Sequence, residues 1–209
     1  MAAVASPAET NAVLHHVSWR TYESLLEDFA DRGSPRLTYD RGTLEIMSPT
    51  KRHEELNRIL ALLVDTACEE LGLDVQSLGS MTFRRKDLDR GFEPDSCFYF
   101  AKADLVRGKE RVDLTVDPPP ELVIEIDITT SSVPKDEIYA SLGVLEVWRY
   151  DGNTLGIGLL QGKSYVESEA SAAIPLLTAD ALFQFVEMSK TATRPQLLRA
   201  FRDRLRARR

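Results

Sequence analysis

The residue types that build disulfide frameworks and soft-metal sites are scarce in this chain of 209 residues. It has two cysteines, Cys68 and Cys97, and three histidines. Two cysteines exclude a disulfide framework and a multi-cysteine zinc cluster. Two of the histidines are the adjacent pair His15 and His16, so a multi-histidine metal site is also excluded. The small number of thiols indicates a reducing, cytoplasmic compartment.

Long apolar runs and an excess of basic residues are also missing. No run of about 18 apolar residues occurs, so no membrane-spanning helix is expected. The N-terminus lacks the basic and apolar segments of a secretory signal. The net charge of −7 argues against a protein that coats nucleic acid through bulk charge. Residues 194–209, however, hold seven arginines and one acidic residue, and this basic tail is either a phosphate contact or a solvated helix end.

The stretch 121–128 is the feature around which the rest of the chain can be organised. Three prolines at 118–120 mark its start, because proline cannot continue a strand ladder. Four aliphatic residues then alternate with three carboxylates and a valine, so a strand would have one apolar and one acidic face. Glu125 and Asp127 would point the same way. Such like charges coexist if the site is wet, if one is protonated, or if a cation lies between them.

The residues after this strand predict a helix. Residues 129–132 are four possible N-caps, and the helix begins near Lys135 and contains Tyr139. A strand that carries carboxylates, followed by a helix that carries a lysine, fits a metal site for phosphodiester chemistry. Asp95, which follows Pro94, would add a further oxygen ligand.

Hydrophobic periodicity predicts an α/β fold. The expected helices cover residues 18–32, 50–71, 133–142, 178–190 and 195–208, and the expected strands cover 36–39, 43–47, 75–78, 81–85, 92–100, 121–128, 144–150, 154–160 and 164–167. A helix between the strands at 121–128 and 144–150 implies that these two strands are parallel. We expect a loose N-terminal segment at 1–17, one domain at 18–170, and a C-terminal helical extension with a basic tail at 171–209.

The order of these motifs resembles the PD-(D/E)XK nuclease superfamily. Pro94-Asp95 followed by Glu125-Ile126-Asp127 is similar to its signature of proline-aspartate, a gap, and acid-any-lysine. More specifically, the chain resembles a restriction-endonuclease-like branch of bacterial proteins of unknown function. The matching stretches span about residues 18–160 and comprise 36–49, 53–54, 94–95, 121–126 and 138–149. The chain departs from the signature at Asp127, where the superfamily has lysine, and Lys135 on the next helix would replace it.

The resemblance implies a restriction-endonuclease-like core, with a central mixed β-sheet flanked by helices. It implies a metal-dependent endonuclease that hydrolyses DNA phosphodiester bonds as a homodimer, without a small-molecule cofactor. Mg²⁺ or Mn²⁺ would be held by three carboxylates and the Ile126 carbonyl: Asp95, Glu125 and Asp127. The expected catalytic residues are Lys135, Glu125, Asp95 and Glu54, and the expected DNA-backbone contacts are Arg84, Arg85 and Lys86.

Each of these residues also has a structural interpretation. Asp95 and Asp127 could be strand-end turn residues, and Lys135 could be solvated. Glu54 could be an acid favoured by the helix dipole, and His53 could make a helix-start hydrogen bond. The alternative to an enzyme is a catalytically inactive module of the same fold, acting in DNA binding or protein interaction. A third possibility is a structural domain with no nucleic-acid role.

Overall fold

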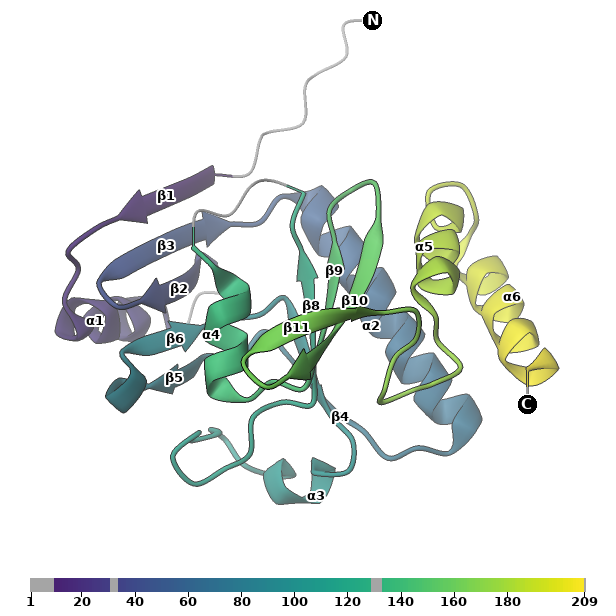
Figure 1. Ribbon diagram of the computed structural model, residues 1–209. Coiled ribbons are helices and arrows are strands. Elements are labelled where there is room, and N and C mark those ends of the chain that lie inside the picture. Colours follow the sequence, from purple (N-terminus) through teal and green to yellow (C-terminus); the bar gives the residue numbers. More distant parts are fainter. Residues whose placement is uncertain (1–9, 31–33, 129–132, 209) are drawn as a thin grey trace, which may run out of the picture.

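Two β-sheets form the framework of the protein, for which a computed structural model describes residues 10–30, 34–128 and 133–208 (Figure 1). The first sheet has five strands in the order β1-β3-β2-β6-β5, and the second has six in the order β11-β10-β9-β8-β7-β4. Helices cover both faces of the second sheet. The expected mixed α/β architecture is therefore confirmed, while the predicted N-caps at 129–132 lie outside the described residues.

The five-stranded sheet is antiparallel and packs against α1 (Trp19–Phe29), which Ser18 caps. Its strands are β1 (Thr10–Leu14), β2 (Arg36–Asp40), β3 (Thr43–Ser48), β5 (Phe83–Arg85) and β6 (Arg90–Phe92). Residues 10–14 pair along β3, so the expectation of a loose segment is wrong for them. β1 is a short edge strand whose pairing depends on β3, so its own sequence shows little sign of it.

The six-stranded sheet is mixed. Its strands are β4 (Gln76–Gly79), β7 (Ser96–Tyr99), β8 (Leu122–Ile126), β9 (Glu146–Tyr150), β10 (Leu155–Gln161) and β11 (Ser164–Ser168). β8 and β9 are parallel and are joined by α4 (Lys135–Leu142), which confirms the predicted crossover. The other pairs in this sheet are antiparallel.

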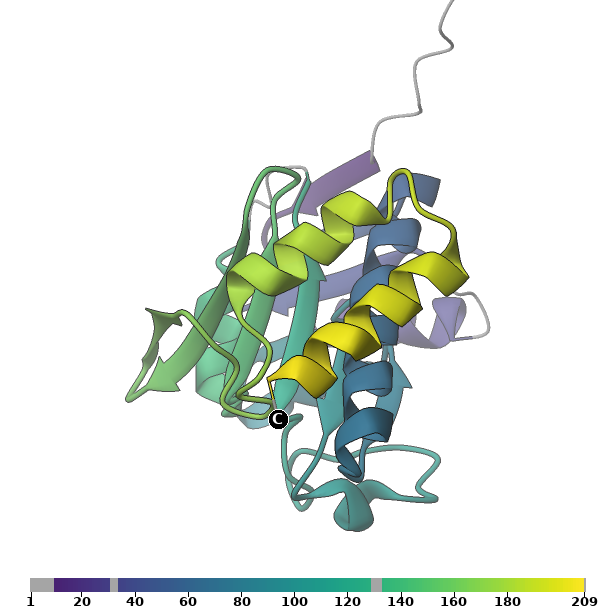
Figure 2. The same cartoon turned by 90° about the vertical axis from the view of Figure 1, so that its right-hand side faces the viewer.

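Three long helices cover one face of this sheet (Figure 2). They are α2 (Lys51–Leu71), α5 (Ala179–Met188) and α6 (Arg194–Ala207). Thr50 caps the N-terminus of α2, and Gly72 ends it in the left-handed conformation with φ 69°. The alternating apolar residues of β8 point into this layer, where Leu122, Ile124 and Ile126 join the main core with apolar residues of all three helices.

The opposite face of β8 and β9 is covered by α4. Ile138 and Tyr139 of α4 pack in the same cluster as Val123 and Val147. Because side chains alternate along a strand, Glu125 lies on this face, beneath α4. Two short helical segments complete the fold: α3 (Ala103–Val106) and the 3₁₀ turn η1 (Lys86–Leu88).

The predicted strand 92–100 is divided between the two sheets. β6 ends at Phe92 in the first sheet, and β7 begins at Ser96 in the second. Pro94 lacks the N–H that a continuous ladder would need. The prediction of one strand is therefore wrong, and the break places Asp95 where the chain passes from one sheet to the other.

Part of the basic C-terminal helix is engaged with α2. Arg202 lies 3.0 Å from both Glu69 and Glu70, and Arg206 lies 2.9 Å from Glu70. These two arginines thus neutralise the acidic C-terminal turn of α2. Among the described residues, none of the helices has the length and apolarity needed to cross a membrane.

Candidate active site

Glu125 is the centre of a buried charged cluster beneath α4. Glu125 is 1% exposed. Lys135 Nζ lies 2.6 Å from one carboxylate oxygen, and the Tyr139 hydroxyl donates a hydrogen bond of 2.5 Å to the other. Lys135 and Tyr139 are four residues apart on α4 and therefore share a helix face. The helix thus delivers one cation and one hydroxyl donor to the same carboxylate.

Asp127 extends this cluster toward β9. Lys135 Nζ lies 3.2 Å from Asp127, and Arg149 Nε donates to its other oxygen at 2.7 Å. Arg149 also reaches Asp136 on α4 at 2.8 Å. Glu125, Lys135, Asp127, Arg149 and Asp136 therefore form a chain of alternating charges. The ammonium of Lys135 is the cation that lets the two neighbouring carboxylates coexist.

The cluster fixes the protonation of its donors. Burial alone would lower the pKa of Lys135, but the nearby Glu125 and Asp127 carboxylates outweigh it and raise the pKa. Burial and the Glu125 carboxylate raise the pKa of Tyr139 well above its usual value. Near neutral pH, Lys135 is therefore a charged ammonium and Tyr139 a neutral hydroxyl donor.

Asp95 is joined to the strand that carries Glu125. Asp95 is 2% exposed, and its Oδ2 accepts a hydrogen bond of 2.7 Å from the backbone N–H of Ile126. Its Oδ1 forms an ion pair with Arg36 and lies 2.8 Å from His53 Nε2. The structure therefore places the Asp95 carboxylate beside β8, where it contacts Ile126, the residue that follows Glu125. Hydrogen-bond donors surround the Asp95 carboxylate.

Glu54 reaches Asp95 through an arginine. Arg36 Nη2 donates to Glu54 at 2.6 Å, and Arg36 also pairs with Asp95. Arg36 is the first residue of β2, whereas His53 and Glu54 lie in the first turn of α2. His53 is fully buried. The two sheets and the N-terminus of α2 therefore meet at this group.

Three charged residues of this region were not singled out from the sequence: Glu45, Arg36 and Arg149. Glu45 lies on β3, is 2% exposed, and contributes to the raised pKa of Lys135. The signal for it was present, because a carboxylate in an apolar strand is costly without a partner. The two arginines gave no comparable signal, since arginine near a strand end is commonly solvated.

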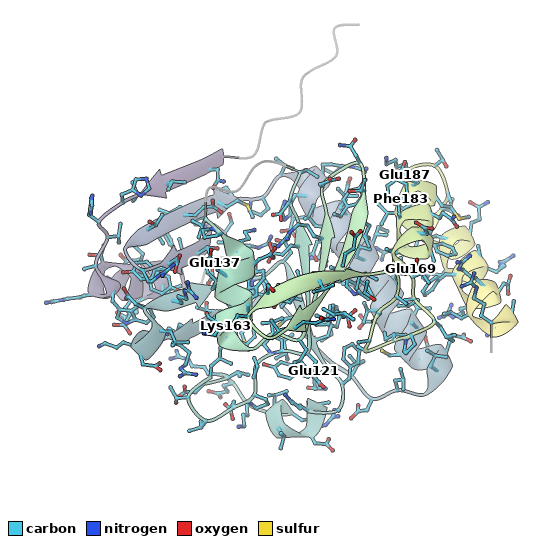
Figure 3. The ribbon with its side chains drawn as sticks, in the orientation of Figure 1. Glu121, Glu137, Lys163, Glu169, Phe183 and Glu187 are labelled. Atoms are coloured by element: carbon cyan, nitrogen blue, oxygen red, sulfur yellow. The ribbon has the colours of Figure 1, made fainter. Side chains whose placement is uncertain are left out.

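The helix that positions Lys135 is attached to the other sheet. Figure 3 labels Glu137 on α4, where its backbone carbonyl accepts a hydrogen bond of 3.0 Å from Arg90 of β6. Arg90 also pairs with Asp40 of β2 at 2.8 Å. These contacts hold α4 across the junction of the two sheets and above Glu125.

The expected DNA contacts lie on β5 and η1: Arg84, Arg85 and Lys86. Among the described residues, no contact joins them to the carboxylates of Glu125, Asp127 or Asp95. Arg85 is held by Asp87 at 2.6 and 2.7 Å, and Arg84 lies 3.6 Å from Glu23. Lys86 is exposed. Two of the three cations are therefore already paired within the protein.

The oxygen donors near Glu125 are of the kind that Mg²⁺ prefers. Within the described ranges, no group of three or more His, Cys, Asp or Glu side chains is arranged to hold a metal ion. Glu125 and Asp127 nevertheless share one cation, the Lys135 ammonium. Mg²⁺ is commonly held by one or two carboxylates, with water and substrate phosphate completing its shell. The residues therefore fit Mg²⁺ or Mn²⁺, and they do not fit a zinc site of thiolates and imidazoles.

Two open clefts lie in this region of the protein. One, of about 490 Å³, is bordered by Arg36, Glu54 and Asp95. The other, of about 250 Å³, is bordered by Arg149 and Asp136. The charged cluster thus borders open space at Arg149 and Asp136, and the group around Asp95 borders the other cleft.

Comparison with known proteins identifies the family. No curated protein matches this chain. A solved structure described as "a putative nuclease belonging to DUF820 from Anabaena variabilis ATCC 29413" is similar in fold, with a TM-score of 0.52 and 14% identity, over 77% of this chain and 98% of that chain. A family model named Uma2 and described as "Putative restriction endonuclease" matches residues 19–189. Since that match covers most of the sequence, the chain belongs to the Uma2 family.

Proposed function

We propose that this protein is a metal-dependent nuclease that hydrolyses phosphodiester bonds in DNA. The observation that carries the proposal is the position of Lys135, whose Nζ lies 2.6 Å from Glu125 and 3.2 Å from Asp127. The signature that the chain resembles has its lysine two residues after the acid, where this chain has Asp127. An ammonium supplied from α4 reaches the same carboxylates, so the departure does not remove the cation.

The proposed metal ligands are Asp95, Glu125 and Asp127, together with the backbone carbonyl of Ile126. The chemistry that Mg²⁺ or Mn²⁺ supplies in such a site is Lewis-acid polarisation of a phosphoryl oxygen. The family match supports this assignment, as does the pair of carboxylates, Glu125 and Asp127, that share the Lys135 ammonium.

The protein's own side chains have separate roles in this proposal. Lys135 stays charged, so it stabilises negative charge that develops on the phosphate and orients the attacking water, and it does not act as a base. Tyr139 holds Glu125 in one orientation. Arg36 and His53 hold Asp95, and Arg36 places Glu54 at the rim of the site.

The proposal extends to the substrate and the assembly. Arg84, Arg85 and Lys86 are the proposed contacts with the DNA backbone, and contacts of this kind position a duplex without reading its sequence. Cleavage of both strands needs two copies of the site, so we propose a homodimer that acts in the cytoplasm.

Cleavage of supercoiled plasmid by Glu125→Gln tests the function. Glutamine has nearly the shape of glutamate, but it removes the negative charge. We expect the wild type to cut in Mg²⁺ or Mn²⁺ and not in EDTA, and we expect Glu125→Gln to be inactive. Glu169→Gln, which makes the same chemical change at an exposed position, is the matched control and should cut normally (Figure 3). Wild-type cutting by purified Glu125→Gln would refute the proposal.

A catalytically inactive module that binds DNA or another protein is the second candidate. The net charge of −7 favours it, as does the engagement of both Glu125 oxygens by Lys135 and Tyr139. This candidate predicts DNA binding in EDTA and no cutting in Mg²⁺ or Mn²⁺.

A further inference from the structure

The cleft of about 250 Å³ beside Arg149 is not explained by the charged cluster itself. It lies on the same face of the six-stranded sheet as Glu125, beyond the part that α4 covers. Its lining comes mainly from β9, β10 and β11, with Asp136 from α4, and includes Arg149, Gly156, Gly158, Tyr165 and Glu167.

Strand register places this cleft in line with the candidate active site. Glu125 of β8 is the partner of Arg149 on β9, and Arg149 is the partner of Gly156 on β10. Neighbouring strands lie about 4.8 Å apart, so the Cα atoms of Glu125 and Gly156 are separated by roughly 10 Å across the sheet. One nucleotide can span that separation. A strand whose phosphate lies at Glu125 can therefore place an adjacent base in the cleft.

The floor of the cleft is made of glycine. Gly156 and Gly158 are alternate residues of β10 and so share one face, while Leu155 and Ile157 point into the core on the other. A Cβ atom on Gly156 would meet no other atom within 4 Å. Glycine within a strand weakens it, and it often marks a position where a ligand approaches the backbone closely.

An aromatic side chain and a carboxylate border this floor. The Tyr165 side chain packs closely over Gly158, and its hydroxyl donates to the Val144 carbonyl at 2.7 Å, which fixes the ring. Glu167 is the strand partner of Gly158 and is exposed. Among the described residues, nothing donates a hydrogen bond to the Glu167 carboxylate or pairs with it. The cleft therefore offers a ring for stacking and an open acceptor for N–H groups.

We infer that this cleft binds an unpaired nucleobase of the substrate strand, next to the phosphate that is cut. The base stacks on Tyr165 above the glycine floor, and its ring or amino N–H groups donate to Glu167. A base in a duplex is stacked, and its pairing edge is occupied, so the substrate strand must be unpaired at this position. The inference rests on the proposed nuclease function and deepens it, because it requires the DNA strand that is cut to be unpaired next to the scissile phosphate.

Binding of a short single-stranded oligothymidine with one 2-aminopurine tests this inference in EDTA. Quenching of 2-aminopurine reports stacking, and anisotropy of a terminal dye reports affinity. We expect quenching by the wild type, and at least tenfold weaker binding of the same sequence as a duplex. Stacking of one base on an aromatic ring commonly strengthens binding roughly 5- to 150-fold.

Gly156→Val is the decisive variant, because valine fills the floor and suits a strand better than glycine. Gln161→Val is its matched control, since it places valine in the same strand. Gln161 is exposed and lies on the face of β10 opposite to Gly156. Tyr165→Leu removes the ring. We expect Gly156→Val and Tyr165→Leu to lose the quenching and to bind at least fivefold more weakly, while Gln161→Val matches the wild type.

The outcomes separate this inference from the nuclease proposal. Equal binding of duplex and single strand, or wild-type binding and quenching by folded Gly156→Val, would overturn the inference and leave the nuclease proposal intact. Binding that depends on the cleft in a protein that never cuts DNA would support the base site and refute the nuclease. Thermal unfolding of each variant verifies that it is folded.

Discussion

Replacing Lys135 by methionine should destabilise the protein strongly. Methionine keeps most of the side-chain volume, but it removes the ammonium between Glu125 and Asp127. The Lys135 side chain is 11% exposed and that of Glu125 is 1% exposed, so water cannot replace the lost charge. Removal of one partner from a buried ion pair costs about 3–5 kcal/mol. Because Tyr139 still donates to Glu125 and Arg149 still pairs with Asp127, we expect the lower end, about 3 kcal/mol.

Urea unfolding at neutral pH measures this loss, and a double-mutant cycle with Glu125→Gln identifies its cause. In the double variant Lys135→Met/Glu125→Gln the buried carboxylate is gone, so most of the lost stability should return. The raised pKa of Lys135 also sets the pH range over which its ammonium stabilises the folded protein. Its contribution is fully present below the unfolded lysine pKa of about 10.4, and it is lost only as the pH rises through the higher folded value. A loss below about 1 kcal/mol for Lys135→Met, with no recovery in the double variant, would refute the role of the ammonium.

Other predictions concern the core, the surface and the thiols. Leu60→Ala removes a fully buried side chain of α2 and should lower the free energy of unfolding by about 2–5 kcal/mol. Arg206→Gln removes an exposed ion pair and should lower the free energy of unfolding by less than about 1 kcal/mol. Equal losses for the two variants in urea unfolding would contradict this packing. Gly72→Ala places a Cβ at φ 69° and should cost about 1 kcal/mol by the same assay, and an unchanged midpoint would contradict the left-handed helix end. Burial raises the pKa of Cys68 to about 11 and that of Cys97 to about 12, so both thiols should resist a thiol reagent at pH 8 until the protein is unfolded in urea; rapid labelling of the folded protein would show that they are exposed.

Much of the fold could be predicted because its elements carry local signals. The alternation around Glu125 gave β8 and its acidic face, and the parallel partner followed from the helix between two strands. Thr50 and Gly72 marked the ends of α2 through capping chemistry. These signals depend on a few neighbouring residues and need no knowledge of the tertiary structure.

The sheet boundaries were harder to predict for a physical reason. Phe92 and Ser96 belong to different sheets, yet both lie in the stretch 92–100, where Pro94 is the only residue that lacks a backbone N–H for a strand ladder. Alternation shows that a residue lies in a strand, but it does not show which sheet receives the strand. β1 was missed for a related reason, since an edge strand is stabilised by its partner.

The candidate site was predictable only where its residues lie close in sequence. Glu125, Asp127 and Lys135 fall within eleven residues, and the structure places them in direct contact. Arg36, which pairs with Asp95 across the junction of the two sheets, comes from a distant segment. Contacts of this kind depend on how the sheets pack, and no periodicity in the sequence encodes them.

Titration of Mn²⁺ into the protein by calorimetry tests the central claim most directly. The protein should be saturated with a phosphorothioate single strand that resists cleavage, so that a phosphate ligand is present. We expect the wild type and Glu169→Gln to bind Mn²⁺ and Glu125→Gln to lose that binding. Equal Mn²⁺ binding by the wild type and Glu125→Gln, or none by the wild type, would contradict a metal site at Glu125 and with it the account of this protein as a metal-dependent nuclease.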